Sequence, residues 1–86
     1  MKEIERNLKA LANARRLKIV LYLRRVKKAS VSDIAEEIKL SFKSTSRHLS
    51  VLASAGIISK EQVGLEVFNN ISDKSHKIVS EVLKLM

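Results

Sequence analysis

The sequence predicts a mainly α-helical fold with one small β-hairpin (α+β), in the order helix, helix, helix, helix, strand, strand, helix. Apolar residues recur every three or four positions along most of the chain, which is the period of an amphipathic helix. Proline is absent and the only two glycines are Gly56 and Gly64, so few residues interrupt the helices. Two short runs rich in β-branched and aromatic residues flank Gly64, and these predict the two strands.

The first helix is predicted from Ile4, Leu8 and Leu11, whose i, i+4, i+7 spacing places them on one face. The second helix is apolar over a wide arc, so it should be the central and most buried one. Its apolar residues are Leu17, Ile19, Val20, Leu21, Tyr22, Leu23 and Val26. Asn13 lies between the two helices and is suited to cap the second, because its side-chain oxygen can accept from a free amide.

Two shorter helices should follow a brief extended segment at 29–31. Ser32 is expected to cap the third helix, and Ser41 is the cap candidate for the fourth, at 42–55. The predicted inner face of the fourth helix consists of Leu49, Leu52 and Ala53, with Thr45 and Ala55 at its margins. Gly56 should end this helix in the left-handed conformation.

Residues 57–62 and 66–71 are the predicted strands, with the turn at 63–65, and Ser72 or Asp73 is expected to cap the last helix. That helix carries two apolar stripes, one of Ile78, Val82 and Leu85 and the other of Val79, Leu83 and Met86. The stripes of the first and last helices could both belong to the core of a monomer. However, two stripes on one short helix are more than a small body can cover, and this favours a dimer.

The chain has a large excess of positive charge, with 17 Lys and Arg against 9 Asp and Glu, a net charge of +8 and a pI near 10.1. Such an excess fits either a solvated surface or a polyanionic partner. Its distribution favours nucleic acid, because segments 6–32 and 39–60 contain no acidic residue. The basic cluster at 24–28 has two interpretations, because cations are also stabilising at a helix C-terminus.

Several classes of protein are disfavoured by composition. The absence of cysteine excludes disulfides, thiolate nucleophiles and zinc–sulfur sites, and it fits a cytoplasmic protein. The apolar runs are too short to span a bilayer and no signal peptide is evident, so no membrane association is expected. Three scattered aromatic residues do not make a stacking platform for single strands. Neither a paired-carboxylate site nor a glycine-rich phosphate loop is present, so an enzyme is not expected.

The segment around the fourth helix predicts a helix-turn-helix that reads the major groove of DNA. Such a helix needs an apolar stripe that holds it on the body and an opposite stripe of hydrogen-bond donors. The candidate DNA-binding residues in this segment are Ser41, Phe42, Lys43, Ser44, Ser46, Arg47 and His48. Arg47 can bind both acceptors of a guanine, whereas Lys43 can reach a guanine or a phosphate. His48 is interpreted as a partly buried residue or a phosphate donor rather than a metal ligand.

From Leu8 to Ile71 the chain resembles the ArsR-type winged-helix transcriptional regulators. Residues 8–19 (LKALANARRLKI) are similar to the family's opening pattern LKALANPxRLxIL, with Ala14 in the usual place of proline. Residues 46–52 (SRHLSVL) and the following AGII match the more specific pattern SRHLxVLxxAGL.

This resemblance implies one winged-helix domain over residues 1–86 and a symmetric homodimer built from the first and last helices. It also implies that the dimer binds an imperfect palindrome in double-stranded DNA through the helix at 42–55. Lys60, Gln62 and the Gly64 turn would form the wing. The function so predicted is a sequence-specific transcriptional regulator, most simply a repressor.

Two departures from the family pattern affect the prediction. Residues 29–34 (ASVSDI) lack the cysteines of metal-sensing members, and after Asp73 and His76 the last helix offers only Glu81, so neither a metal site nor a cofactor is expected. The acidic and apolar wing residues would weaken its contact with DNA. Two alternatives therefore remain, namely a winged-helix protein-interaction module and a basic chromosomal protein that binds DNA without regard to sequence.

Overall fold

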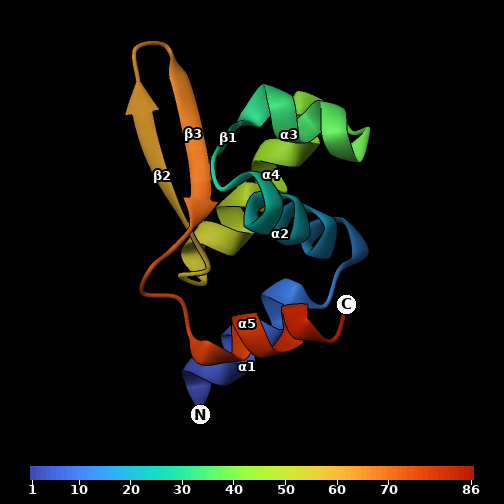
Figure 1. The fold of residues 1–86 in the computed structure, drawn as a ribbon, viewed down its shortest axis with the longest axis vertical. Coiled ribbons are helices and arrows are strands. Elements are labelled where there is room, and N and C mark those ends of the chain that lie inside the picture. The colour runs from blue at the N-terminus through green and yellow to red at the C-terminus, as the bar shows by residue number, and fades with distance from the viewer.

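The computed structural model describes all residues from Met1 to Met86 and contains five helices and three strands. In chain order they are α1 (Lys2–Leu11), α2 (Ala14–Val26), β1 (Ala29–Ser30), α3 (Val31–Ile38), α4 (Phe42–Ser54), β2 (Ile58–Val63), β3 (Glu66–Ile71) and α5 (Lys77–Lys84). Helices α1 and α5 lie at one end of the molecule and the hairpin extends toward the other (Figure 1). The predicted fold class and order of helices are confirmed. No helix is long and apolar enough to cross a membrane.

The sheet has one strand more than the predicted hairpin. It is antiparallel in the order β1-β3-β2, and β1 pairs Ala29 with Asn69 and Ser30 with Phe68. The extended segment before α3 is therefore the third strand, and it joins the hairpin to the helical body. In the hairpin, Lys60 lies opposite Asn69, and Gly64 in the turn has a φ of 64°.

The capping residues agree with the sequence prediction at two helices and differ at two others. Asn13 accepts from the amides of Arg15 and Arg16, and Ser41 accepts from Ser44 at 3.1 Å, as predicted. The prediction of Ser32 as the cap of α3 is wrong. That helix begins two residues earlier and is capped by Ser30, whose hydroxyl accepts from the amide of Asp33.

The prediction for the start of the last helix is also wrong. Helix α5 begins at Lys77, and its cap is His76, whose Nδ1 accepts from the amide of Ile78 at 3.0 Å. Ser72 instead stabilises a turn, because its hydroxyl accepts from the amide of Lys74. His76 is therefore a partly buried structural residue.

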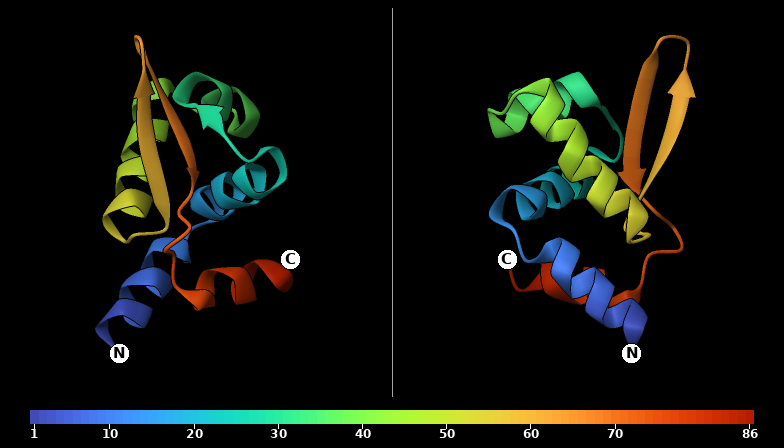
Figure 2. Two further views of the ribbon diagram at one scale, coloured as in Figure 1. Left: turned by 60° about the vertical axis from the view of Figure 1, so that its left-hand side comes forward. Right: turned by 180° about the vertical axis from the view of Figure 1, so that it is seen from behind.

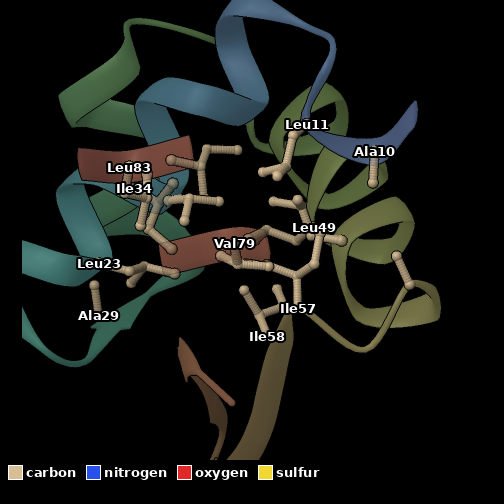
Figure 3. Close-up of a cluster of buried hydrophobic side chains, with 14 residues drawn as sticks. Ala10, Leu11, Leu23, Ala29, Ile34, Leu49, Ile57, Ile58, Val79 and Leu83 are labelled. Atoms are coloured by element: carbon tan, nitrogen blue, oxygen red, sulfur yellow. The ribbon is translucent and has the colours of Figure 1, made fainter. Parts of the chain in front are cut away.

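The core gathers around α2, as the wide apolar arc of that helix predicted. Its Ile19, Val20 and Leu23 are at most 1% exposed and belong to a cluster of buried side chains to which all the other helices contribute (Figure 3). Helix α4 contributes Leu49 and Leu52 to this core. Its Thr45 is fully buried as well, although the sequence analysis placed it at the margin of the inner face.

Helices α1 and α5 each bury one face and leave a second apolar face only partly covered. In α5, Val79 and Leu83 belong to the core, whereas Leu85 is 86% exposed. In α1, Leu11 is buried but Leu8 is 44% exposed. The two stripes predicted on the last helix are therefore covered to different extents, since Ile78 and Val82 are only partly buried against the core, and both stripes end in an exposed residue, Leu85 or Met86.

Replacing Leu52 with alanine should lower the free energy of unfolding by about 2–5 kcal/mol, because the substitution leaves a cavity beneath α4. Leu65→Ala is the matched control, since Leu65 is fully exposed at the hairpin turn and its loss should change stability by less than about 0.5 kcal/mol. Urea unfolding of the two variants measures both values. If both variants lost the same unfolding free energy, the burial of Leu52 in the core would be contradicted.

Candidate nucleic-acid interface

The turn between α3 and α4 sets the direction of α4. Helix α3 is followed by Lys39, which adopts a left-handed conformation with a φ of 56°. The amide of Leu40 then donates to the carbonyl oxygen of Ala35 at 3.0 Å, and this bond closes the helix end. Ser41 starts α4 immediately afterwards. Two helices joined by so short a turn form the helix-turn-helix unit that the sequence predicted.

The far end of α4 is closed by the predicted glycine. Gly56 has a φ of 76°, and the amide of Ile57 donates to the carbonyl oxygen of Leu52 at 3.0 Å. Together with the bond from Gly56 to Ala53, this is a Schellman motif, which directs the chain from α4 into β2. The hairpin is therefore held beside α4 by a defined turn.

One face of α4 is a continuous polar stripe open to solvent. Lys43, Arg47, Ser50 and Ser54 are all exposed, and their spacing of four, three and four residues keeps them on one side of the helix. The opposite side carries the buried Thr45, Leu49 and Leu52. Neither Lys43 nor Arg47 makes an ion pair, so both charges are available to an external anion.

The other predicted residues of this segment lie at the edges of the stripe or outside it. Ser44 and Ser46 are half-buried on either side of the helix, and the hydroxyl of Ser41 is engaged as the cap. Phe42 is 59% exposed but lines a small hollow of about 130 Å³ together with Val67 and other residues of the hairpin and α3. It therefore points toward the hairpin rather than along the stripe.

The side chain of His48 is held in place by a hydrogen bond from Arg16, at the start of α2. Its Nδ1 lies 3.3 Å from Nη1 of Arg16, and since an arginine can only donate, the imidazole nitrogen accepts. The same guanidinium donates through Nε to the carbonyl oxygen of Ala10 at 2.5 Å, so it links the end of α1 to α4. Partial burial, followed by the positive charges of Arg16 and Arg15, lowers the pKa of His48 below its ordinary value of 6.5.

The hairpin places the two predicted wing residues on one face. Lys60 and Gln62 are both exposed, and Gln62 donates through Nε2 to the carbonyl oxygen of Gly64 at 3.3 Å. Glu61 points to the other face and pairs with Lys28 at 2.9 Å. This pair compensates one of the two acidic residues that the sequence analysis counted against the wing, while Glu66 makes no ion pair. Lys28 also lies 5.3 Å from the centre of the Phe68 ring.

The basic cluster at the end of α2 has structural partners. Arg24 donates to the carbonyl oxygen of Leu83 at 3.2 Å, at the end of α5. Arg25 pairs with Glu37 at 3.6 Å and lies over the ring of Tyr22. Of the two interpretations that the sequence left open for this cluster, the structure supports the structural one for these two arginines.

Sequence reasoning missed the partners of Arg16 and Lys28. Arg16 contacts His48 at a separation of 32 residues, and Lys28 contacts Glu61 at a separation of 33. Both cations appeared only as members of basic runs. No local pattern marks either pair, because each forms only when the helices pack and the hairpin joins β1.

A helix-turn-helix with an unpaired cationic stripe on its second helix, followed by a hairpin, defines the winged helix-turn-helix class of DNA-binding proteins. Comparison with known proteins indicates the same class. Residues 13–60 match the family model described as bacterial regulatory protein, arsR family. The arsenical resistance operon repressor of Bacillus subtilis is 31% identical over 84 residues, which cover 96% of this chain and 80% of that protein. The chain belongs to the ArsR family and is a DNA-binding transcriptional regulator.

Solved structures show the same architecture. HlyU from Vibrio cholerae is 30% identical with a TM-score of 0.85, covering 98% of this chain and 90% of that one. The transcriptional repressor PagR of Bacillus anthracis is 28% identical with a TM-score of 0.82, covering 98% and 92%. A homodimeric winged helix-turn-helix DNA-binding domain from Mycobacterium bovis is 28% identical with a TM-score of 0.80, covering 98% and 74%.

The stability of the protein should fall as the pH drops below 6.5, in part through His48. Because the folded-state pKa of His48 is the lower one, the unfolded chain takes up the proton first. The contribution of neutral His48 is therefore complete above pH 6.5 and is lost as the pH falls toward the folded-state pKa. His48→Gln, which can still accept from Arg16, should lose less unfolding free energy between about pH 7.5 and pH 5.5 in urea titrations. If the unfolding free energies of the wild type and the variant fell by the same amount over this pH range, His48 would not be the source of the pH dependence.

Proposed function

We propose that this regulator binds an inverted repeat in double-stranded DNA as a homodimer and represses transcription by occupying that site. The observation that carries the proposal is the stripe of Lys43, Arg47, Ser50 and Ser54, which lies opposite the buried face of α4. Its two cations have no partner within the chain. The B. subtilis and B. anthracis relatives are both described as repressors, which supports this mode of action.

The base-reading part of the interface is the N-terminal half of α4. Arg47 is the residue for bidentate contact with a guanine, because its guanidinium is exposed and unpaired on the stripe. Lys43 lies one turn earlier, where it reaches a base edge or a phosphate. Ser44 and Ser46 flank the stripe and supply short hydroxyl contacts. His48 acts indirectly in this proposal, since its ring holds α4 to Arg16.

The wing supplies contacts with the DNA backbone in this proposal. Lys60 and Gln62 project from one face of the hairpin, and the pairing of Glu61 with Lys28 reduces the repulsion of phosphates. Phe42 and Ser41 contribute at the start of α4, where free amides and the helix dipole favour a phosphate. The cytoplasm is the compartment in which such a regulator meets DNA.

A catalytic role is not part of the proposal. The Nδ1 atom of each of the two histidines is engaged in a structural bond, in one case with Arg16 and in the other with the amide of Ile78. Both side chains therefore stabilise the fold.

Selection from a random duplex library at physiological salt tests the proposed function. We expect an enriched inverted repeat with half-sites about one helical turn apart. Arg47→Ala should then cost about 1–3 kcal/mol at one base pair and relax the preference there. Lys60→Ala is the matched control, because loss of a phosphate contact should weaken binding to all sequences alike. Retention without an enriched motif would indicate sequence-indifferent binding, and no retention would favour the protein-interaction module.

The uncovered faces of α1 and α5 form the dimer interface in this proposal. The apolar residues left exposed or half-exposed on these helices are Ile4, Leu8, Ile78, Val82, Leu85 and Met86. Both helices lie at the same end of the molecule, where a second copy can cover them together (Figure 2).

Leu8→Glu should raise the dissociation constant of the dimer by about 100-fold or more, because a symmetric interface buries two unpaired carboxylates. Leu65→Glu introduces the same charge at the hairpin turn and should leave the dimer intact. Sedimentation equilibrium measures both. A Leu8→Glu protein that dimerises as tightly as the control would show that α1 is not in the interface.

A further inference from the structure

A second basic feature lies beside the stripe of α4, in a hollow of about 580 Å³ between α1 and α4. Arg6 and Lys9 of α1 line one side, Ser50 and Ser54 of α4 line the other, and Arg16 of α2 also contributes. These side chains come from three elements that are separate in sequence. None of the residues that line the hollow is acidic, so its electrostatic character is positive.

The cations of the hollow differ in how free they are. Arg6 makes no ion pair. Lys9 lies 4.0 Å from Glu5, but both side chains are more than half exposed, so this pair is weak. Arg16 is held in place by the carbonyl oxygen of Ala10 and by His48. Three of its five N–H donors are engaged, and it contributes a fixed positive charge, whereas Arg6 and Lys9 are exposed to solvent.

The serine side of the hollow is continuous with the proposed DNA-reading stripe. Ser50 and Ser54 are the C-terminal half of that stripe, and both are exposed. Their hydroxyls make no hydrogen bond within the chain, unlike those of Ser30 and Ser41, which cap helices. Hydroxyl and cationic donors together are the usual partners of DNA phosphates.

The position of the hollow relative to the hairpin indicates its occupant. Seen from behind, α4 runs across the molecule with the hairpin on one side and α1 on the other (Figure 2, right). A helix that enters the major groove has one phosphate strand on each side of it. The wing is placed to contact one strand, and the hollow is placed to contact the other.

We propose that the hollow between α1 and α4 binds a backbone phosphate on the side of the major groove opposite the wing, with Arg6 and Lys9 as cationic donors and Ser50 and Ser54 as hydroxyl donors. This inference rests on the proposed function and extends it. Helix α1 thereby contacts DNA as well as the second subunit. In the proposed dimer α1 is central, so these phosphates lie between the two half-sites.

The test compares the salt dependence of binding to the inverted repeat for two variants of equal charge. Arg6→Gln/Lys9→Gln removes both exposed cations of the hollow but keeps long side chains. Lys18→Gln/Arg25→Gln removes one lysine and one arginine from a different hollow, between α2 and α3, and is the control. Fluorescence anisotropy on the selected duplex gives the slope of log Kd against log salt, and circular dichroism verifies the fold of both variants.

We expect the slope of the Arg6/Lys9 variant to be smaller by about 2, since a dimer loses one phosphate contact per subunit at roughly 0.9 each. Its preferred sequence should stay the same, and the control should keep the wild-type slope. On a duplex with uncharged methylphosphonates between the half-sites, the wild type should weaken while the variant should lose little further affinity.

Two results would overturn the inference and they are distinguishable. If the wild type binds its repeat with a steep salt dependence and the Arg6/Lys9 variant keeps that slope, then α1 does not contact phosphate, and the proposed function stands. If the wild type selects no repeat at all, the proposed function fails, and this inference fails with it.

Discussion

The burial of α2 is the constraint on which the rest of this structure depends. Ile19, Val20 and Leu23 lose nearly all contact with water, and each of the other helices places its own apolar side chains against that cluster. For α4 this fixes rotation about its axis, because Leu49 and Leu52 can meet the core in only one orientation. The direction in which Lys43 and Arg47 point is therefore a consequence of core packing.

The positive charges of this chain are divided between structure and surface. Arg16, Arg24, Arg25 and Lys28 each contact a partner within the fold, either a carbonyl oxygen, a carboxylate or an aromatic ring. Cations without an ion pair occur on several elements, and those that face the proposed DNA-binding side include Lys43 and Arg47 on α4, Arg6 on α1 and Lys60 on the wing. The net charge of +8 is therefore spread over the surface, and some of the cations also hold elements together.

In the proposed dimer, helix α1 takes part in both assembly and DNA binding. It leaves Leu8 44% exposed and also carries Arg6 and Lys9 beside α4. Arg16 links the end of α1 to His48 on α4 through two hydrogen bonds. A displacement of α1 at an interface would therefore alter the contacts that position the recognition helix. Coupling of this kind requires contiguous contacts between rigid elements, and this short path provides them.

Local features of the sequence determined most of the fold. Helical periods, the cap at Asn13, the cap at Ser41 and the left-handed Gly56 are decided within a few residues, so the pattern predicts them. Inspection of the sequence also indicated the family, because that signal is a run of consecutive residues. The two misplaced caps show the limit of local reasoning, since several polar residues near a helix start can cap it and only the packed chain selects one.

Tertiary structure decided everything that depends on residues distant in sequence. The pairing of β1 with β3, the bond between Arg16 and His48, the pair of Lys28 with Glu61 and the hollow between α1 and α4 all join segments tens of residues apart. Packing of the core brings these segments together, and no periodic pattern in the sequence predicts which of them will be in contact. The sequence thus determined which side chains could bind DNA, and the packing decided which of them face outward together.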